Sequence, residues 1–230
     1  GEDIYDKDFD MRKLRSKVGL VFQYPEHQLF ETDIFKDVCF GPKNLGLDRA
    51  ETELRAFEAL RLVGLDESLY YQSPFDLSGG QKRRVAIAGV LAMKPEVLIL
   101  DEPTAGLDPK ERIAIRNYIA ELSRNKIILF ATHVVSDIEC IADYVLLLKK
   151  GEIIAMGTPV ELIEKMHGKV AEITCTLDEV GKLQEKYHIG NIRQRKNGIV
   201  LRLVGDELPD EAVMVDENID LEDVYLYYFE

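Results

Sequence analysis

The sequence predicts an α/β protein with a parallel sheet, a helical subdomain inserted between two of its strands, and a small C-terminal α+β tail. The apolar run at residues 97–100 is typical of a strand buried on both faces of a parallel sheet, and the runs at residues 18–22 and 127–131 indicate two further buried strands. After residue 24 the chain loses sheet character. Beyond Gly168 the pattern changes to a short β-α-β-β succession followed by a last helix.

Composition narrows the function. The 230 residues include 42 acidic and 29 basic side chains, a net charge of −13, which argues against general nucleic-acid binding because such binding relies on neutralising phosphates. No apolar run approaches the roughly 18 to 20 residues that cross a bilayer, and we find no leader of the signal-peptide type. Cys39, Cys140 and Cys175 lack metal-ligand spacing, so we expect reduced packing residues in a cytosolic protein.

The first apolar run leads directly to Gln23, and a helix follows further along the chain. Asp48 is a suitable N-cap for that helix, and Gly64 is a suitable stop. Its apolar positions predict the buried face: Ala50, Leu54, Phe57, Leu60 and Val63. A helical subdomain is therefore predicted over residues 24–93.

A glycine pair opens another helix in the run Leu77-Ser78-Gly79-Gly80-Gln81. The Ser78 hydroxyl, the free backbone N–H groups of the first turn and the helix dipole favour an anion there. The two glycines would let a phosphate approach the backbone closely. The alternative interpretation is a plain junction between a loop and a helix.

Three cations follow in the first turns of this helix. Lys82, Arg83 and Arg84 oppose the helix dipole, which is tolerable beside bound phosphates, and a solvated helix face is an equal alternative. The small apolar side chains of the same helix are expected to pack on the sheet: Val85, Ala88 and Ala92.

Carboxylates follow the second strand, at the edge where open α/β sheets bind their ligands. Asp101 is placed to hold a divalent cation, and Glu102 is placed to orient or deprotonate a water. Asp108 is a suitable N-cap for a helix that has Pro109 at its first position. The buried face of that helix is predicted from its apolar residues: Ile115, Ile119 and Leu122.

The third strand ends at Thr132-His133, and His133 is a candidate to hydrogen-bond a phosphate or an attacking water. Two further strands, at residues 144–148 and 153–156, surround a tight turn, and Thr158-Pro159 begins a closing helix. The tail is too short to bury much surface by itself, so we expect it to dock on the preceding part or on a second subunit.

These motifs together resemble those of ATP-binding cassette (ABC) ATPases over residues 18–159. Residues 77–81 resemble their signature motif, residues 97–102 their Walker B strand with its glutamate, and residues 105–108 their D-loop. Residues 131–133 resemble the switch-histidine loop and residues 21–23 the Q-loop. The middle of the chain resembles cobalt and vitamin energy-coupling-factor importers, whereas residues 221–225 resemble exporters.

The resemblance implies a sheet like that of P-loop NTPases and an ATPase subunit that uses ATP and Mg²⁺ to power transport. It implies that Asp101 and Gln23 lie at the metal, that Glu102 is the catalytic base, and that His133 and Gln23 sense the γ-phosphate. It also implies that five residues act in trans, on the nucleotide bound by a second ABC ATPase subunit: Ser78, Gly79, Gly80, Gln81 and Asp108. Transmembrane permease subunits are the other implied partners, on the cytoplasmic face of the membrane, and no nucleic acid is expected.

The resemblance also divides the chain into an ATPase domain at residues 1–167 and an accessory domain at residues 168–230. The phosphate-binding G-x-x-x-x-G-K-[ST] loop is absent from this sequence, so the chain by itself is expected to be inactive. An exporter ATPase, or a partner that contributes only the signature face, is the alternative function. A cassette ATPase of DNA repair or translation fits the acidic balance and the importer-like insertion less well.

Overall fold

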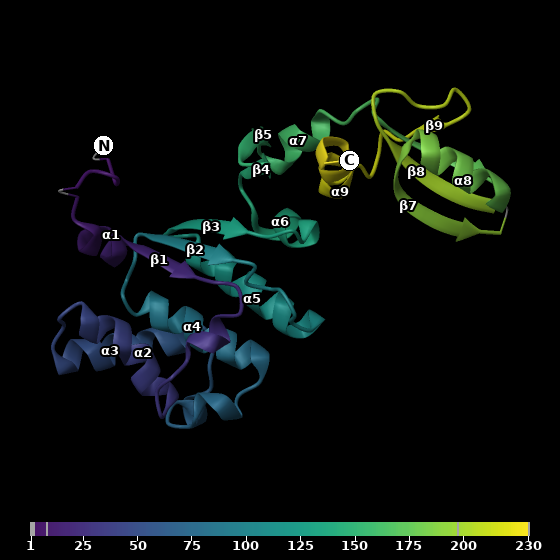
Figure 1. Ribbon diagram of the computed structural model, residues 1–230. Coiled ribbons are helices and arrows are strands. Elements are labelled where there is room, and N and C mark those ends of the chain that lie inside the picture. Colours follow the sequence, from purple (N-terminus) through teal and green to yellow (C-terminus); the bar gives the residue numbers. More distant parts are fainter. Residues whose placement is uncertain (1–2, 8, 197, 230) are drawn as a thin grey trace. The chain divides into compact units, whose positions relative to one another are not determined.

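A computed structural model describes residues 3–7, 9–196 and 198–229 of the chain. The chain divides into two compact units, Gly1–His133 and Val134–Glu230, which are described separately here. Figure 1 shows a helix-and-sheet assembly in the first unit, and hairpins, short helices and a small sheet in the second. The boundary expected at residue 168 stays a prediction.

The first unit is built on a three-stranded parallel sheet. Its strands are β1 (Val18–Val21), β2 (Val97–Asp101) and β3 (Ile127–Ala131), in the order β1-β2-β3. The register pairs Val21 with Leu100 and Leu100 with Phe130, so the three strands end close to one another. The predicted strands and their parallel arrangement are confirmed, and the side chains that follow them share one edge.

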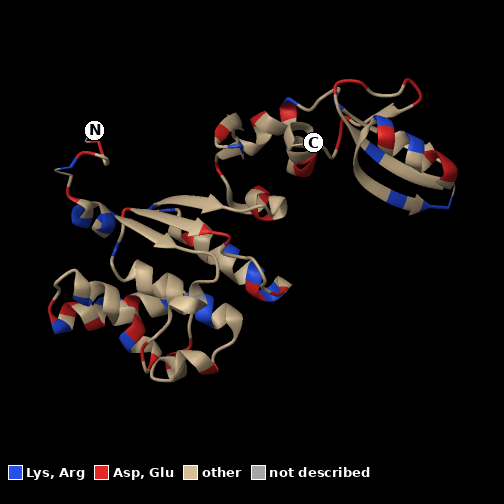
Figure 2. Cartoon of the chain, viewed as in Figure 1, with Lys and Arg blue, Asp and Glu red and all other residues tan. Residues whose placement is uncertain are grey.

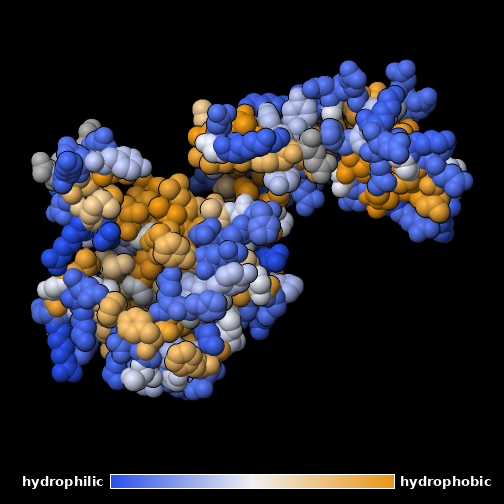
Figure 3. Space-filling model, in the orientation of Figure 1, coloured by the Kyte–Doolittle hydropathy of each residue, from blue (hydrophilic) through white to orange (hydrophobic). Residues whose placement is uncertain are grey.

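Helices cover one face of this sheet, and the described residues of the same unit leave much of the other face exposed. Helices α4 (Gly79–Leu91) and α5 (Pro109–Leu122) belong to successive crossovers in the same direction, which places both on one face (Figure 1). Leu98 and Leu100 point to that face and are 0% exposed, whereas Ile127 on the opposite face is 65% exposed. The prediction of a buried strand is therefore wrong for β3, whereas Val97 and Ile99 on the opposite face of β2 are half-buried. Figure 3 shows the apolar residues gathered over this sheet.

Helix α1 (Met11–Lys17) precedes β1. The helical subdomain expected over residues 24–93 consists of α2 (Ile34–Asn44), α3 (Arg49–Leu62) and α4, with short 3₁₀ turns at Pro25–Gln28, Glu67–Leu69 and Pro74–Asp76. Asp48 accepts a hydrogen bond from the Glu51 N–H as the N-cap of α3, and Gly64 ends that helix at a φ of +64°, both as predicted.

The buried face of α3 differs from the predicted one. Leu54 and Phe57 are 52% and 42% exposed, and Ala50 is exposed as well. Leu60 and Val63 are buried, as predicted. The other buried residues through which α3 packs against α2 and α4 are smaller: Thr52, Ala56 and Ala59. Small residues allow closely packed helices, and apolar periodicity alone does not show which face has neighbours.

The second unit begins with α6 (Val135–Ile141), the antiparallel hairpin of β4 (Val145–Lys149) and β5 (Glu152–Gly157), and α7 (Pro159–Glu164). The hairpin turn has two residues at positive φ, Lys150 at +54° and Gly151 at +85°, as two-residue turns between antiparallel strands require. Thr158 and Glu161 form a capping box at the start of α7. The predicted hairpin and closing helix are confirmed.

The tail forms an antiparallel sheet of β6 (Val170–Cys175), β7 (His188–Arg195), β8 (Gly198–Val204) and β9 (Val213–Met214), with α8 (Leu177–Lys186) after β6 and α9 (Leu221–Phe229) at the end. The strand order β7-β8-β6-β9 is that of a split β-α-β, or ferredoxin-like, sheet. Helix α9 contacts α6 and α7 as well as the sheet. The expectation that the tail docks on the preceding part is therefore confirmed.

A buried ion pair fixes α9 to its sheet. Arg202 on β8 donates from Nε and Nη2 to the Asp223 carboxylate, both at 2.7 Å, and Asp223 is 2% exposed. An apolar cluster continues across the expected domain boundary, because Leu162 and Met166 pack with Val224. Residues on the two sides of residue 168 therefore share one core.

The three cysteines are free thiols. Cys39 and Cys175 are buried, as expected of packing residues, and burial raises the pKa of both thiols. Cys140 is exposed, so the packing interpretation is wrong for this residue.

Candidate functional site

The carboxyl edge of the three-stranded sheet brings together side chains that are far apart in the sequence. Gln23 follows β1, Asp101 ends β2 and is followed by Glu102, and Thr132-His133 follows β3. The register places Asp101 opposite Ala131, at the last paired position. A carboxyl edge with acidic, amide and imidazole groups is the usual ligand side of an open α/β sheet.

Glu102 has an unusual backbone conformation. Its φ is +45°, in the left-handed region that a residue with a Cβ rarely adopts. Its N–H donates to the Ala131 carbonyl at 2.8 Å, which extends the pairing of β2 and β3 by one residue and holds this conformation. Strained conformations of this kind are concentrated at functional sites, which supports a functional role for Glu102.

The Glu102 carboxylate is held by the residues that follow β3. The Thr132 hydroxyl donates to Oε2 at 3.1 Å, and the His133 backbone N–H donates to Oε1 at 2.8 Å. The His133 ring contributes a further contact, with Nδ1 at 2.5 Å from Oε1. The structure thus joins two sequence-predicted site residues, and the outer part of the His133 side chain, which is 72% exposed, faces solvent.

The glycine pair at the start of α4 divides into two different roles. Ser78 and Gln81 form a reciprocal capping box, in which Ser78 Oγ accepts from the Gln81 N–H and Gln81 Oε1 accepts from the Ser78 N–H. A Cβ at Gly80 would lie 2.4 Å from the Glu111 carboxylate, so internal packing explains Gly80. A Cβ at Gly79 would meet nothing within 4 Å, and the φ of Gly79 is not positive.

Within the described part of the chain, neither packing nor backbone conformation therefore requires a glycine at position 79. A helix N-terminus with an open approach is suited to a phosphate that comes from outside. The packing role of Gly80 supports the junction interpretation for that residue, and the open surface at Gly79 supports the anion interpretation.

Arg83 and Arg84 do not form the phosphate patch or the solvated face that the sequence suggests. Arg83 is 1% exposed, and its Nη1 donates to the carbonyls of Pro103 at 2.9 Å and Ala105 at 2.8 Å. Arg84 pairs with Glu111, because its Nη2 donates to both oxygens of that carboxylate. The sequence around Arg83 does not indicate that its partners are backbone carbonyls about twenty residues further along the chain. The sequence analysis therefore missed the hydrogen bonds from Arg83 to Pro103 and Ala105.

Asp108 caps α5, because its carboxylate accepts from the Glu111 N–H at 3.0 Å and Pro109 occupies the first helical position. Gly106 precedes it with a φ of +72°, which a glycine adopts without strain. The capping role that the sequence predicts is confirmed, and the Asp108 side chain remains exposed. A contact of Asp108 with a second subunit stays a prediction.

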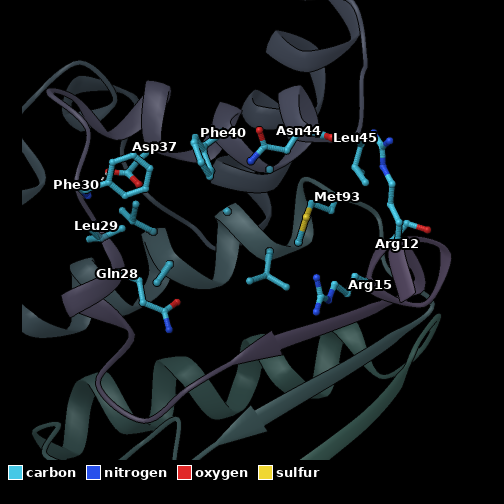
Figure 4. Close-up of a pocket in the computed structure, with 16 residues that line it drawn as sticks. Arg12, Arg15, Gln28, Leu29, Phe30, Asp37, Phe40, Asn44, Leu45 and Met93 are labelled. Atoms are coloured by element: carbon cyan, nitrogen blue, oxygen red, sulfur yellow. Dashed lines mark hydrogen bonds between the residues drawn. The ribbon is translucent and has the colours of Figure 1, made fainter. Parts of the chain in front are cut away.

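A groove of about 630 Å³ lies beside the segment that follows Gln23. In Figure 4, Leu29, Phe30 and Phe40 lie toward one end of it, and Arg12 and Arg15 of α1 lie toward the other. Figure 2 shows the concentration of basic residues on α1.

Asp37 holds the wall of this groove. Its Oδ2 accepts the backbone N–H groups of Phe30 and Glu31 at 3.0 and 2.9 Å, and burial raises the pKa of this carboxyl. Sequence reasoning predicted the helical subdomain but not the groove, because residues from four separate segments line it.

The carboxylate and amide oxygens at the carboxyl edge of the sheet are suitable ligands for a cation that also binds a phosphate. Among residues 3–7, 9–196 and 198–229, no group of three or more His, Cys, Asp or Glu side chains is arranged to hold a metal ion. Mg²⁺ usually takes one or two protein ligands, with waters and substrate phosphates as the rest. Asp101 at the end of β2, with the Gln23 amide on the neighbouring strand end, fits that requirement.

Comparisons with known proteins find several similar chains. The family profile described as ABC transporter matches residues 1–105. An energy-coupling factor transporter ATP-binding protein EcfA2 from Symbiobacterium thermophilum is 52% identical over 220 residues, which are 95% of this chain and 71% of that protein. The protein of the same name from Caldanaerobacter subterraneus is 49% identical over 190 residues, covering 79% of this chain and 66% of the relative.

Two solved structures are also similar. One is cbiO1 from Clostridium perfringens, part of the ABC transporter complex cbiONQ, at 39% identity and a TM-score of 0.62, covering 77% of this chain and 72% of that one. The other is a dimeric ATP-binding cassette in a post-hydrolysis state bound to ADP and Pi, at 30% identity and a TM-score of 0.56, covering 66% and 68%. The chain spans 66% of the Caldanaerobacter relative and 56% of a Lactococcus lactis relative.

Proposed function

This chain belongs to the ABC ATPase family and, within it, to the ATP-binding proteins of energy-coupling factor transporters, and on that premise we propose that it hydrolyses ATP to power uptake through a membrane transporter. The main support is Glu102, a strained residue at the carboxyl edge of the sheet whose carboxylate is oriented by Thr132 and His133. Phosphate release by the full-length gene product in the presence of MgATP tests this proposal.

Each site residue has a role in this proposal. Asp101 and Gln23 would hold Mg²⁺, which would neutralise charge on the phosphates. Glu102 accepts a proton from the attacking water through its carboxylate. His133 keeps the carboxylate in place through its backbone N–H, and its ring is positioned to hydrogen-bond the γ-phosphate or the water.

The signature face acts on the nucleotide of a second ATPase subunit. The open approach to Gly79 at the N-terminus of α4 supports this role, because a Cβ at Gly79 would meet no atom of the described residues within 4 Å. Ser78 and Gln81 hold the first turn of α4 in shape through their capping box, and Asp108 lies exposed at the start of α5. A pair of subunits therefore assembles each site from two chains.

The groove beside Gln23 is proposed to receive a helix of a transmembrane permease subunit. Its apolar end around Phe30 and Phe40 suits an apolar helix face, and Arg12 and Arg15 suit an acidic end of that helix. None of the helices in the described part of the chain has the length and apolar character needed to cross a bilayer. We propose that the permease subunit forms the membrane passage and that this subunit binds it at the cytoplasmic face.

Replacing Phe40 tests the docking proposal. Phe40 is 43% exposed, lines the groove and packs edge-on against Phe30 at 4.9 Å. We expect Phe40→Ala to weaken co-purification with the permease by about tenfold, the effect of losing an aromatic anchor worth more than about 1 kcal/mol. ATP binding should stay unchanged.

Phe75→Ala is the matched control, because Phe75 is 68% exposed in the same subdomain and does not line the groove. Equal losses for the two variants, or no loss for Phe40→Ala, would contradict the docking proposal.

A second function is a partner that contributes only the signature face to another ATPase. The intact capping box and the open Gly79 favour it as much as they favour the leading proposal. The two functions differ at Glu102, which has a role only in an active ATPase. If Glu102→Gln abolishes ATP turnover, this chain is the active enzyme. If ATP turnover is the same with and without this substitution, the chain has the partner function.

A further inference from the structure

Arg83 connects the start of the signature helix to the loop that follows the candidate base. Its Nη1 donates to the Pro103 and Ala105 carbonyls at 2.9 and 2.8 Å and lies 3.5 Å from the Glu102 carbonyl. On the premise of the proposed function, we infer that Arg83 is a positioning residue for hydrolysis. It fixes the position of Glu102 relative to α4.

The loop depends on Arg83 because its carbonyls are buried. Pro103 is buried and Thr104 is 0% exposed, and the loop folds on itself through hydrogen bonds from the Ala105 N–H to the Glu102 carbonyl and from the Leu107 N–H to the Thr104 carbonyl. Buried carbonyls need donors. One guanidinium nitrogen serves two of them, so Arg83 fixes the loop at both sides of Thr104.

The position of this loop affects the reaction because Glu102 is its first residue. A shift of the Glu102 or Pro103 carbonyl rotates the peptide that holds Glu102 at a φ of +45° and moves the carboxylate away from His133. Misplacement of a catalytic group by about 1 Å costs up to about 100-fold in rate. Arg83 also lies about one helical turn beyond Gly80, so the face that meets the partner's nucleotide and the base of the same chain move together.

Two substitutions separate this role from general stabilisation. Arg83→Met in the full-length gene product removes both hydrogen bonds, and we expect kcat to fall about tenfold or more while KM for ATP stays within about threefold, because Arg83 touches no nucleotide in the proposal. Arg83→Lys keeps the charge but not the planar fork, so its kcat should be intermediate.

Lys126→Met is the matched control. Lys126 also donates to a backbone carbonyl, that of Pro95 at 2.7 Å, but at the amino edge of the sheet, away from Glu102. Its kcat should stay within about twofold of wild type, and melting temperatures of all three variants report the folded state.

Amide hydrogen exchange gives a readout that does not depend on activity. In Arg83→Met the Ala105 and Leu107 amides, which close the loop, should exchange at least about tenfold faster, whereas the Leu98 and Leu129 amides, whose N–H groups lie in the ladder between β2 and β3, should not change. Unchanged exchange in the loop, unchanged kcat, or equal kcat losses in Arg83→Met and Lys126→Met would overturn the inference. If the wild-type protein shows no ATP turnover, the proposed function is wrong. Amide exchange in the loop then tests by itself whether Arg83 positions the loop.

Discussion

Glu102→Gln should slow ATP hydrolysis by the full-length gene product by roughly 10²- to 10⁴-fold, the cost of losing a general base. The amide is nearly the same size as the carboxylate and still accepts at one oxygen, so the contacts with Thr132 and the His133 N–H persist in part. ATP binding should remain, because the substitution removes proton acceptance and not a phosphate ligand. Steady-state phosphate release and equilibrium nucleotide binding measure the two effects.

Glu96→Gln is the control for this substitution. Glu96 immediately precedes β2, at the opposite end of the strand from Glu102, and its exposed carboxylate pairs with Lys17 at 2.9 Å. An exposed pair of this kind contributes little to stability, so turnover should stay near wild type. A change of less than a few-fold in Glu102→Gln would exclude Glu102 as the base and make His133 the next candidate.

Gly79→Asp should lower hydrolysis by about 100-fold without lowering the stability of the chain. A side chain at this position meets nothing within 4 Å, and a carboxylate in the first turn of α4 interacts favourably with the helix dipole. The same negative charge opposes a phosphate that approaches the helix N-terminus. Activity and stability are therefore expected to change independently, which turnover and thermal unfolding of the same sample will show.

Gly181→Asp is the matched control for Gly79→Asp. Gly181 lies in α8 of the second unit, and a Cβ there also meets nothing within 4 Å. Turnover of this variant should equal that of wild type. If Gly79→Asp keeps full activity, or if it loses activity only in proportion to lost stability, the proposed contact of α4 with a nucleotide phosphate is wrong.

Local signals in the sequence predicted the elements of this fold well. Asp48, Asp108 and Thr158 each cap the helix that they were expected to begin, because a cap depends on atoms within three or four residues. The edge that joins Glu102 to His133 followed from the order of parallel strands. Regular patterns and short-range hydrogen bonds therefore carried most of the prediction.

Features that depend on distant segments were not predictable in the same way. Ile127 is apolar whether or not a neighbour covers it, so its exposure depends on which face of the sheet the helices occupy. Lys82 and Arg83 are neighbouring basic residues, and the sequence does not show which of them is buried. Tertiary packing buries the Arg83 guanidinium against Pro103 and Ala105. The groove beside Gln23 likewise exists only where α1, α2 and α4 meet.

The chemical identity of the nucleotide that the protein retains tests the central claim most directly. The full-length Glu102→Gln protein is incubated with MgATP, separated from free nucleotide and denatured, and the released nucleotide is identified beside that from wild type. If the carboxylate after β2 activates the water, the variant retains ATP and wild type retains ADP. Recovery of ADP from the variant, in the same amount as from wild type, would contradict the account.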